Sequence, residues 1–91
     1  MFFDTHVHFD GLGPGKEMEA CAERALAAGV TGMIAVGGSP EANVLVLEIA
    51  GNRVPSSFAA IGYDRYCAAK ELPLAPFDAL LNGRKRVVAI G

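Results

Sequence analysis

The stretch Phe2-Phe3-Asp4-Thr5-His6-Val7-His8-Phe9-Asp10 opens the chain and decides how the rest of the sequence is interpreted. Its apolar residues predict a strand over about residues 2–7, and successive side chains of a strand point to opposite faces. His6 and His8 therefore share one face, roughly 6–7 Å apart along the strand. They are the only histidines in the sequence, and imidazole is the commonest metal ligand among side chains. The pattern predicts a metal site formed by His6 and His8.

Acidic residues lie on both sides of the histidine pair. Asp4 precedes it on the same predicted face, and metal-bound histidines usually have a partner that fixes the ring, often a carboxylate. Asp4 and Asp10 are therefore expected to support or line the site. The glycine-rich segment 11–15 follows at once and places the pair at the mouth of a loop, where sites on α/β scaffolds lie. The alternative is that these histidines are ordinary surface residues.

Composition restricts the class of protein. The 91 residues suffice for one small domain, and an apolar content of 52% indicates segments buried on both faces, as in parallel sheets. The formal net charge of −2 is not typical of a protein that binds nucleic acid through a general basic surface. Cys21 and Cys67 fit neither a zinc ribbon nor a disulfide framework. Without a leader pattern or an apolar run of about 20 residues, we expect a cytoplasmic protein with no membrane segment.

Strands and helices alternate along the sequence. Residues 30–36 are apolar except for Thr31, which is typical of a strand covered on both faces. Ser39-Pro40-Glu41 combines three signals for a helix start. The predicted strands are 2–7, 30–36, 58–62 and 87–90, and the predicted helices are 16–28, 40–50 and 76–82.

The spacing of these elements predicts the fold class. A strand–helix unit recurs about every 28–30 residues, which implies right-handed crossovers and a parallel sheet. Eight such units, about 250 residues, build a TIM-type (β/α)8 barrel. We therefore expect an α/β fold of about half such a barrel, with four strands and three helices.

The first strand carries a resemblance to a known family. Residues 4–10 resemble the N-terminal signature D-T-H-x-H-[LF]-D of TatD-like metal-dependent hydrolases, which belong to the amidohydrolase-like barrels, and residues 87–91 are similar to the strand that leads into G-E-x-G-L-D. The resemblance implies a divalent metal ion (zinc, magnesium or manganese) at the C-terminal ends of the strands, with His6 and His8 as ligands. It also implies deoxyribonuclease-like hydrolysis of phosphodiester bonds, chiefly in DNA, by metal-activated water.

The chain departs from the family pattern in two places. It ends at Gly91, one residue before the family's next ligand, a glutamate, so we expect residues 1–91 to be the N-terminal part of a barrel, truncated at the fourth strand and inactive alone. The family's Gly-x-His-Pro pattern is here Gly62-Tyr63-Asp64-Arg65. Asp64 therefore either lines the site or begins an exposed turn. Tyr63 and Tyr66 either border a substrate or pack under the loop.

A half-barrel leaves two open sheet edges and an uncovered inner face, so we expect the chain to self-associate. Met33, Ala35, Ala60 and Gly62 are candidates for that inner face.

Two other functions stay open: another amidohydrolase-like enzyme acting on amides or phosphate monoesters, and a non-catalytic α/β domain that self-associates. The basic cluster 84–86 precedes the fourth strand, at the end opposite the histidines, and is interpreted as a solvated loop.

Overall fold

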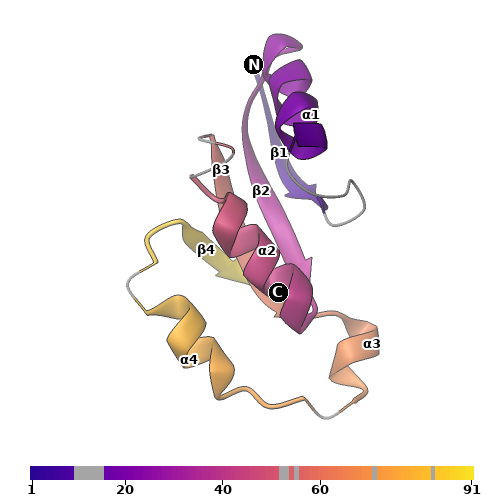
Figure 1. Cartoon of the computed structure of the whole chain (residues 1–91), viewed down its shortest axis with the longest axis vertical. Helices are drawn as coiled ribbons and strands as arrows, with labels where there is room; N and C mark the ends of the chain where they lie inside the picture. The colour runs from indigo at the N-terminus through magenta and orange to yellow at the C-terminus, as the bar shows by residue number, and fades with distance from the viewer. Residues whose placement is uncertain (10–15, 52–53, 55, 71, 83) are drawn as a thin grey trace.

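The computed structural model describes residues 1–9, 16–51, 54, 56–70, 72–82 and 84–91. Strands and helices alternate as the sequence predicts (Figure 1). The four strands are parallel and lie side by side in the order β1-β2-β3-β4. In chain order the elements are β1 (Phe2–Val7), α1 (Lys16–Ala27), β2 (Val30–Gly38), α2 (Pro40–Ile49), β3 (Ser57–Tyr63), α3 (Arg65–Ala68), α4 (Pro76–Leu81) and β4 (Val87–Ile90).

The ends of the helices follow their capping residues. The Ser39 hydroxyl accepts a hydrogen bond from the Ala42 amide at 3.1 Å, and Pro40 occupies the first turn of α2. Gly29 follows α1 with φ of 102°, a conformation that favours glycine and turns the chain into β2. The structure adds one helix to the three expected: α3, a single turn that begins after Asp64.

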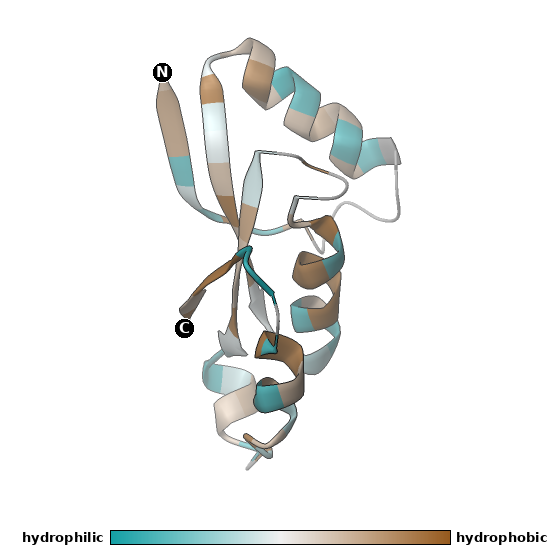
Figure 2. Ribbon diagram, turned by 90° about the vertical axis from the view of Figure 1, so that its left-hand side faces the viewer, coloured by the Kyte–Doolittle hydropathy of each residue, from teal (hydrophilic) through white to brown (hydrophobic). Residues whose placement is uncertain are grey.

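The hydrophobic core lies between the sheet and the helices α1 and α2, which cover the same side of the sheet (Figure 2). Met33 and Ala35 of β2 belong to this core, together with Ala59 and Ile61 of β3. The expectation that Met33 and Ala35 lie on an exposed inner face is therefore wrong. Because side chains alternate along a strand, Val36 of β2 lies on the opposite face of the sheet. Val36 pairs with Ala60 of β3.

The pairing of β1 with β2 is irregular next to the histidines. Asp4 pairs with Met33 and Val7 pairs with Ala35, so three steps along β1 correspond to two along β2. An extra residue of this kind is a β-bulge, a feature common beside functional sites. It breaks the simple alternation that predicted Asp4 and His6 on one face.

The two outer strands leave open edges. Among the described strands, β1 pairs only with β2, and β4 pairs only with β3. Large apolar side chains on both strands are exposed: Phe2, Phe3, Val88 and Ile90. Figure 2 shows the apolar end of β4 on the side of the sheet away from α1 and α2. Within the described residues, no helix is long and apolar enough to cross a membrane.

Candidate metal centre

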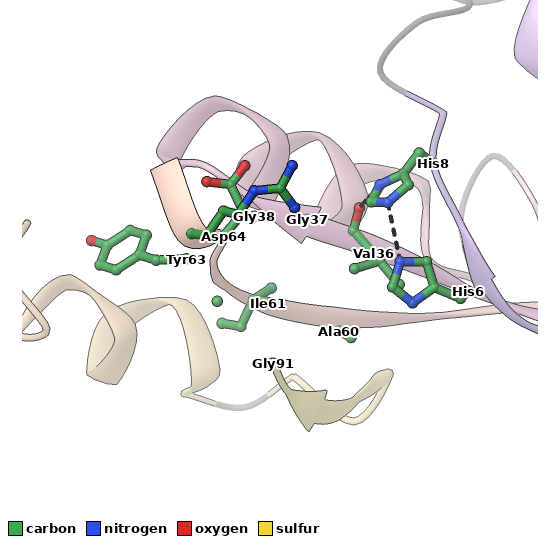
Figure 3. Close-up of a pocket in the computed structure, with 12 residues that line it drawn as sticks. His6, His8, Val36, Gly37, Gly38, Ala60, Ile61, Tyr63, Asp64 and Gly91 are labelled. Atoms are coloured by element: carbon green, nitrogen blue, oxygen red, sulfur yellow. Dashed lines mark hydrogen bonds between the residues drawn. The ribbon is translucent and has the colours of Figure 1, made fainter. Parts of the chain in front are cut away.

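The two imidazoles meet at the C-terminal end of β1 (Figure 3). The Nε2 atoms of His6 and His8 are 3.1 Å apart, and the rings lie edge to face with centroids separated by 4.9 Å. Both side chains are exposed on the rim of a pocket. The sequence prediction that the two rings converge on one point agrees with this geometry.

A backbone carbonyl fixes the ring of His8. Its Nδ1 lies 3.0 Å from the carbonyl oxygen of Val36, in the neighbouring strand β2. A carbonyl oxygen can only accept, so Nδ1 carries the proton and donates it. In that tautomer Nε2 of His8 carries a lone pair and accepts the hydrogen bond from the Nε2–H of His6. Metal-bound histidines typically donate their second ring N–H to a carbonyl or carboxylate in this way.

The separation of the two nitrogens suits one metal ion. Zinc–nitrogen bonds are roughly 2.0–2.1 Å long, so two nitrogens 3.1 Å apart would subtend about 98° at a shared ion. This angle lies between about 90° for octahedral and about 109° for tetrahedral coordination. Among the described side chains, no group of three or more His, Cys, Asp or Glu residues could hold a metal ion, at the histidine pair or at any other place. The described residues therefore bring together two potential ligands, His6 and His8, which is fewer than a catalytic zinc ion normally has.

The pocket beside the histidines has a volume of about 310 Å³. Figure 3 shows His6 and His8 at one end of it and Tyr63 and Asp64 at the other. The residues between them come from the ends of β2 and β3 and are small or apolar: Val36, Gly37, Gly38, Ala60, Ile61 and Gly62. A side chain as small as methyl at Gly62 would collide with the backbone of Gly91, so glycine is needed for this close approach.

The three aspartates singled out in the sequence have different positions. Asp4 accepts a hydrogen bond from the His6 amide at 3.0 Å, so it holds the strand backbone, and it does not line the pocket with the other described residues. Asp10 lies outside the described residues. Asp64 lines the pocket and also begins α3, where its carboxylate accepts from the Cys67 amide at 2.8 Å. Asp64 therefore begins an exposed turn and also borders the pocket beside the histidines, and its role in a functional site stays a prediction.

Hydrogen bonding shifts the acidity of Asp64. The Cys67 amide stabilises the charged carboxylate and lowers its pKa below the ordinary value of 3.8, with a further contribution from the Tyr66 amide. Burial raises the pKa of the Cys67 thiol, and the neighbouring charge of Asp64 raises it further. Cys67 is therefore a protonated thiol at neutral pH and a poor nucleophile.

We expect the cap on α3 to depend on pH in a defined direction. Because the pKa of Asp64 is lowered in the folded chain, its stabilising contribution is present above the ordinary carboxyl range and is lost as pH falls through the lowered pKa. An NMR titration of the Cys67 amide should give a midpoint below 3.8. Asp64→Asn should remove this transition, and a midpoint at or above 3.8 would contradict the assignment.

The two tyrosines on this side of the sheet differ in their contacts. Tyr63 lines the pocket, but its hydroxyl donates to the Pro73 carbonyl at 2.7 Å and its ring packs on Phe77. Tyr66 is exposed and lies under the Arg65 guanidinium, 4.8 Å from the ring centroid. Tyr63 therefore packs under the loop while bordering the pocket.

The basic cluster is separate from the histidines, as expected. Arg86 lies 4.9 Å over the Phe58 ring and donates to the Ser57 carbonyl at the start of β3. Arg84 and Lys85 are exposed just before β4. In a parallel sheet these positions belong to the end opposite the C-terminal ends of the strands.

Sequence reasoning missed the residue that joins the ends of β2 and β3. Asn43 of α2 is 1% exposed, and its side-chain amide bonds to the backbone of both strands. The available signal was one amide side chain at the start of a helix that continues as Val44-Leu45-Val46-Leu47. A buried polar group needs hydrogen-bond partners, so a polar residue in this apolar context could have indicated a specific hydrogen-bonding role.

Comparison with known proteins identifies the family. A family model described as TatD related DNase matches residues 3–91. The matched range contains the histidine pair and the alternating elements from α1 to β4. A search of curated proteins found no match, and a search of solved structures found none either. The family match covers nearly the whole sequence, and on that ground the chain belongs to the TatD-related DNases.

Proposed function

We propose that this chain contributes the first two metal ligands of a TatD-type hydrolase that cleaves phosphodiester bonds, with DNA as the substrate class. The observation that carries the proposal is the 3.1 Å approach of the two Nε2 atoms, with the Val36 carbonyl behind His8. Family membership supports the hydrolase class.

The two cysteines, which are not disulfide-bonded, favour a reducing compartment such as the cytoplasm.

The residues of this chain have distinct parts in the proposed site. His6 and His8 would hold a zinc, manganese or magnesium ion through Nε2. When bound, such an ion supplies a Lewis acid and lowers the pKa of its water. The Val36 carbonyl keeps the His8 ring in the ligating tautomer. The small and apolar residues between the histidines and Asp64 leave room for a substrate close to the strand ends.

Two imidazoles do not complete a catalytic site. A catalytic zinc ion normally has three protein ligands and one open position, and two-metal phosphodiesterases need more. We therefore propose that residues 1–91 alone bind metal without turnover. Hydrolysis would need ligands from additional polypeptide, supplied in the same protein or by association.

The test is a comparison of substrates with the polypeptide of the complete reading frame. The proposal expects metal-dependent release of nitrophenol from bis(4-nitrophenyl) phosphate and cleavage of single-stranded DNA, both lost with His6→Ala plus His8→Ala. Preference for 4-nitrophenyl phosphate or for an amide would support another amidohydrolase-like reaction. Metal binding without turnover of any of these substrates would support a non-catalytic role.

We also propose that residues 1–91 associate with a second copy through their open sheet edges. The accessible surface is 5830 Å², whereas a folded monomer of 9.5 kDa is expected to expose about 5,000 Å². The excess of about 800 Å² equals one partner's share of a standard interface. Since all four strands are parallel, β4 of one copy can pair with β1 of another in the same orientation.

Substitution of an edge residue tests this association. We expect light scattering at about 100 μM to give a dimer for the parent chain and a monomer for Val88→Lys, because a charge on an edge strand opposes pairing. Val44→Lys is the matched control, since Val44 on α2 is exposed to a similar extent, 58% against 51%. A monomeric parent chain, or equal effects of the two substitutions, would contradict association through the edge.

A further inference from the structure

The side chain of Asn43 joins three elements at the pocket. Its Oδ1 accepts from the Gly38 and Gly62 amides, each at 3.1 Å, and its Nδ2 donates to the Gly62 carbonyl at 2.8 Å. These bonds connect α2 to the C-terminal ends of β2 and β3. The amide uses three hydrogen bonds while almost fully buried, which makes it a strong geometric constraint.

These bonds lie where the regular sheet pairing stops. β2 pairs with β3 residue by residue from Met33 to Val36, and the register then shifts before the pair Gly38–Tyr63. Beyond Val36 a backbone bond joins the two strand ends, from the Asp64 amide to the Gly38 carbonyl at 2.7 Å. Asn43 adds bonds to the Gly38 and Gly62 amides there. Gly37 allows its approach, because a Cβ at Gly37 would collide with the Asn43 side chain.

The segment that Asn43 constrains follows directly on the carbonyl that contacts the His8 ring. Val36, whose carbonyl accepts from His8 Nδ1, lies two residues before Gly38. Gly38 and Gly62, the two residues bonded by Asn43, line the same pocket as the histidines. A movement of the end of β2 would therefore shift the Val36 carbonyl and release the His8 ring from its tautomer.

We propose that Asn43 is a positioning residue for the metal site: it fixes the end of β2, and through the Val36 carbonyl it orients His8 with Nε2 toward His6. This inference rests on the proposed metal binding by His6 and His8. It assigns a role to a side chain that touches neither metal nor substrate. It also gives a role to the single amide side chain in an otherwise apolar stretch of α2.

The test compares Asn43→Ala and Asn43→Asp with Ser39→Ala, which weakens the start of the same helix without touching β2 or β3. Zinc affinity is measured by competition with a chromophoric chelator, at a temperature where circular dichroism shows each variant folded. The His8 tautomer is read separately, without metal, from ¹H–¹⁵N spectra of the imidazoles. Asn43→Asp keeps both accepted bonds and replaces the donated one by a repulsive contact between a carboxylate oxygen and the Gly62 carbonyl, so it disturbs the link to β3 in a different way from the alanine variant.

We expect both Asn43 variants to bind zinc about 10-fold or more weakly, as found for groups that orient metal ligands, and to lose the single Nδ1–H tautomer of His8. Ser39→Ala should stay within about 2-fold of the parent chain, since it leaves the ligand support intact. Folded Asn43 variants with parental affinity and an unchanged tautomer would overturn the inference. Absence of zinc binding in the parent chain would instead refute the proposed function, and the tautomer would still test Asn43.

Discussion

Zinc binding is expected to weaken by at least about 100-fold when His6 and His8 are both replaced by alanine, because ligands matter at least as much as the groups that orient them. The two Nε2 atoms lie 3.1 Å apart, and the described parts of the chain contain no group of three or more potential ligands that could hold zinc instead. Competition with a chelator at about pH 7.5 measures the effect, since protons compete for the ring nitrogens in acid.

Asp4→Asn is the control for this experiment. The Asp4 carboxylate bonds to the His6 backbone amide and lies outside the ring-to-ring contact. An asparagine oxygen can accept the same hydrogen bond, so the affinity for zinc should change by less than about 3-fold, well below the effect expected for a group that orients a ligand. Retention of parental affinity in the double histidine variant would show that zinc binds elsewhere.

The largest loss of stability is expected from truncation of Ile61 in β3. Ile61 is 1% exposed and belongs to the core, so Ile61→Ala should lower the free energy of unfolding by about 2–5 kcal/mol. Its pairing partner Ile90 in β4 is 66% exposed. Ile90→Ala should therefore cost less than about 1 kcal/mol.

The pair of isoleucines makes a controlled comparison, because the substitution is the same and the two residues are pairing partners in neighbouring strands, one buried and one exposed. Urea unfolding followed by circular dichroism gives both free energies, with comparable denaturant slopes expected for the two variants. Equal losses at the two positions would contradict the arrangement of the core. It would mean that β4 is as well covered as β3.

The fold class could be predicted from the sequence, and the structure confirms it. The apolar run after Val30, the cap at Ser39 and the recurring strand–helix unit are local signals, and each corresponds to an observed element. The additional helix α3 is a single turn, too short for a periodic pattern, although its Asp64 cap was a usable signal. The faces of Met33 and Ala35 were assigned wrongly because an apolar strand gives no alternation to follow.

The site could be predicted only in part. The spacing of His6 and His8 indicated their convergence, since it depends on neighbouring residues of one strand. The Val36 carbonyl and the Asn43 amide depend on pairing between segments distant in sequence, at positions where the register shifts. The irregularity between Asp4 and Val7 has the same origin. Backbone groups that hold a ligand leave no trace in the residue types of the sequence.

The most direct test of the metal site is a zinc titration of the ¹⁵N-labelled chain, with imidazole nitrogens observed by long-range ¹H–¹⁵N correlation. The account predicts that Nε2 of His6 and Nε2 of His8 shift together and saturate at one equivalent of zinc, while His8 Nδ1 keeps its proton on the Val36 carbonyl. Nε2 signals that stay in place as zinc is added, or loss of the His8 Nδ1 proton to the metal, would contradict it.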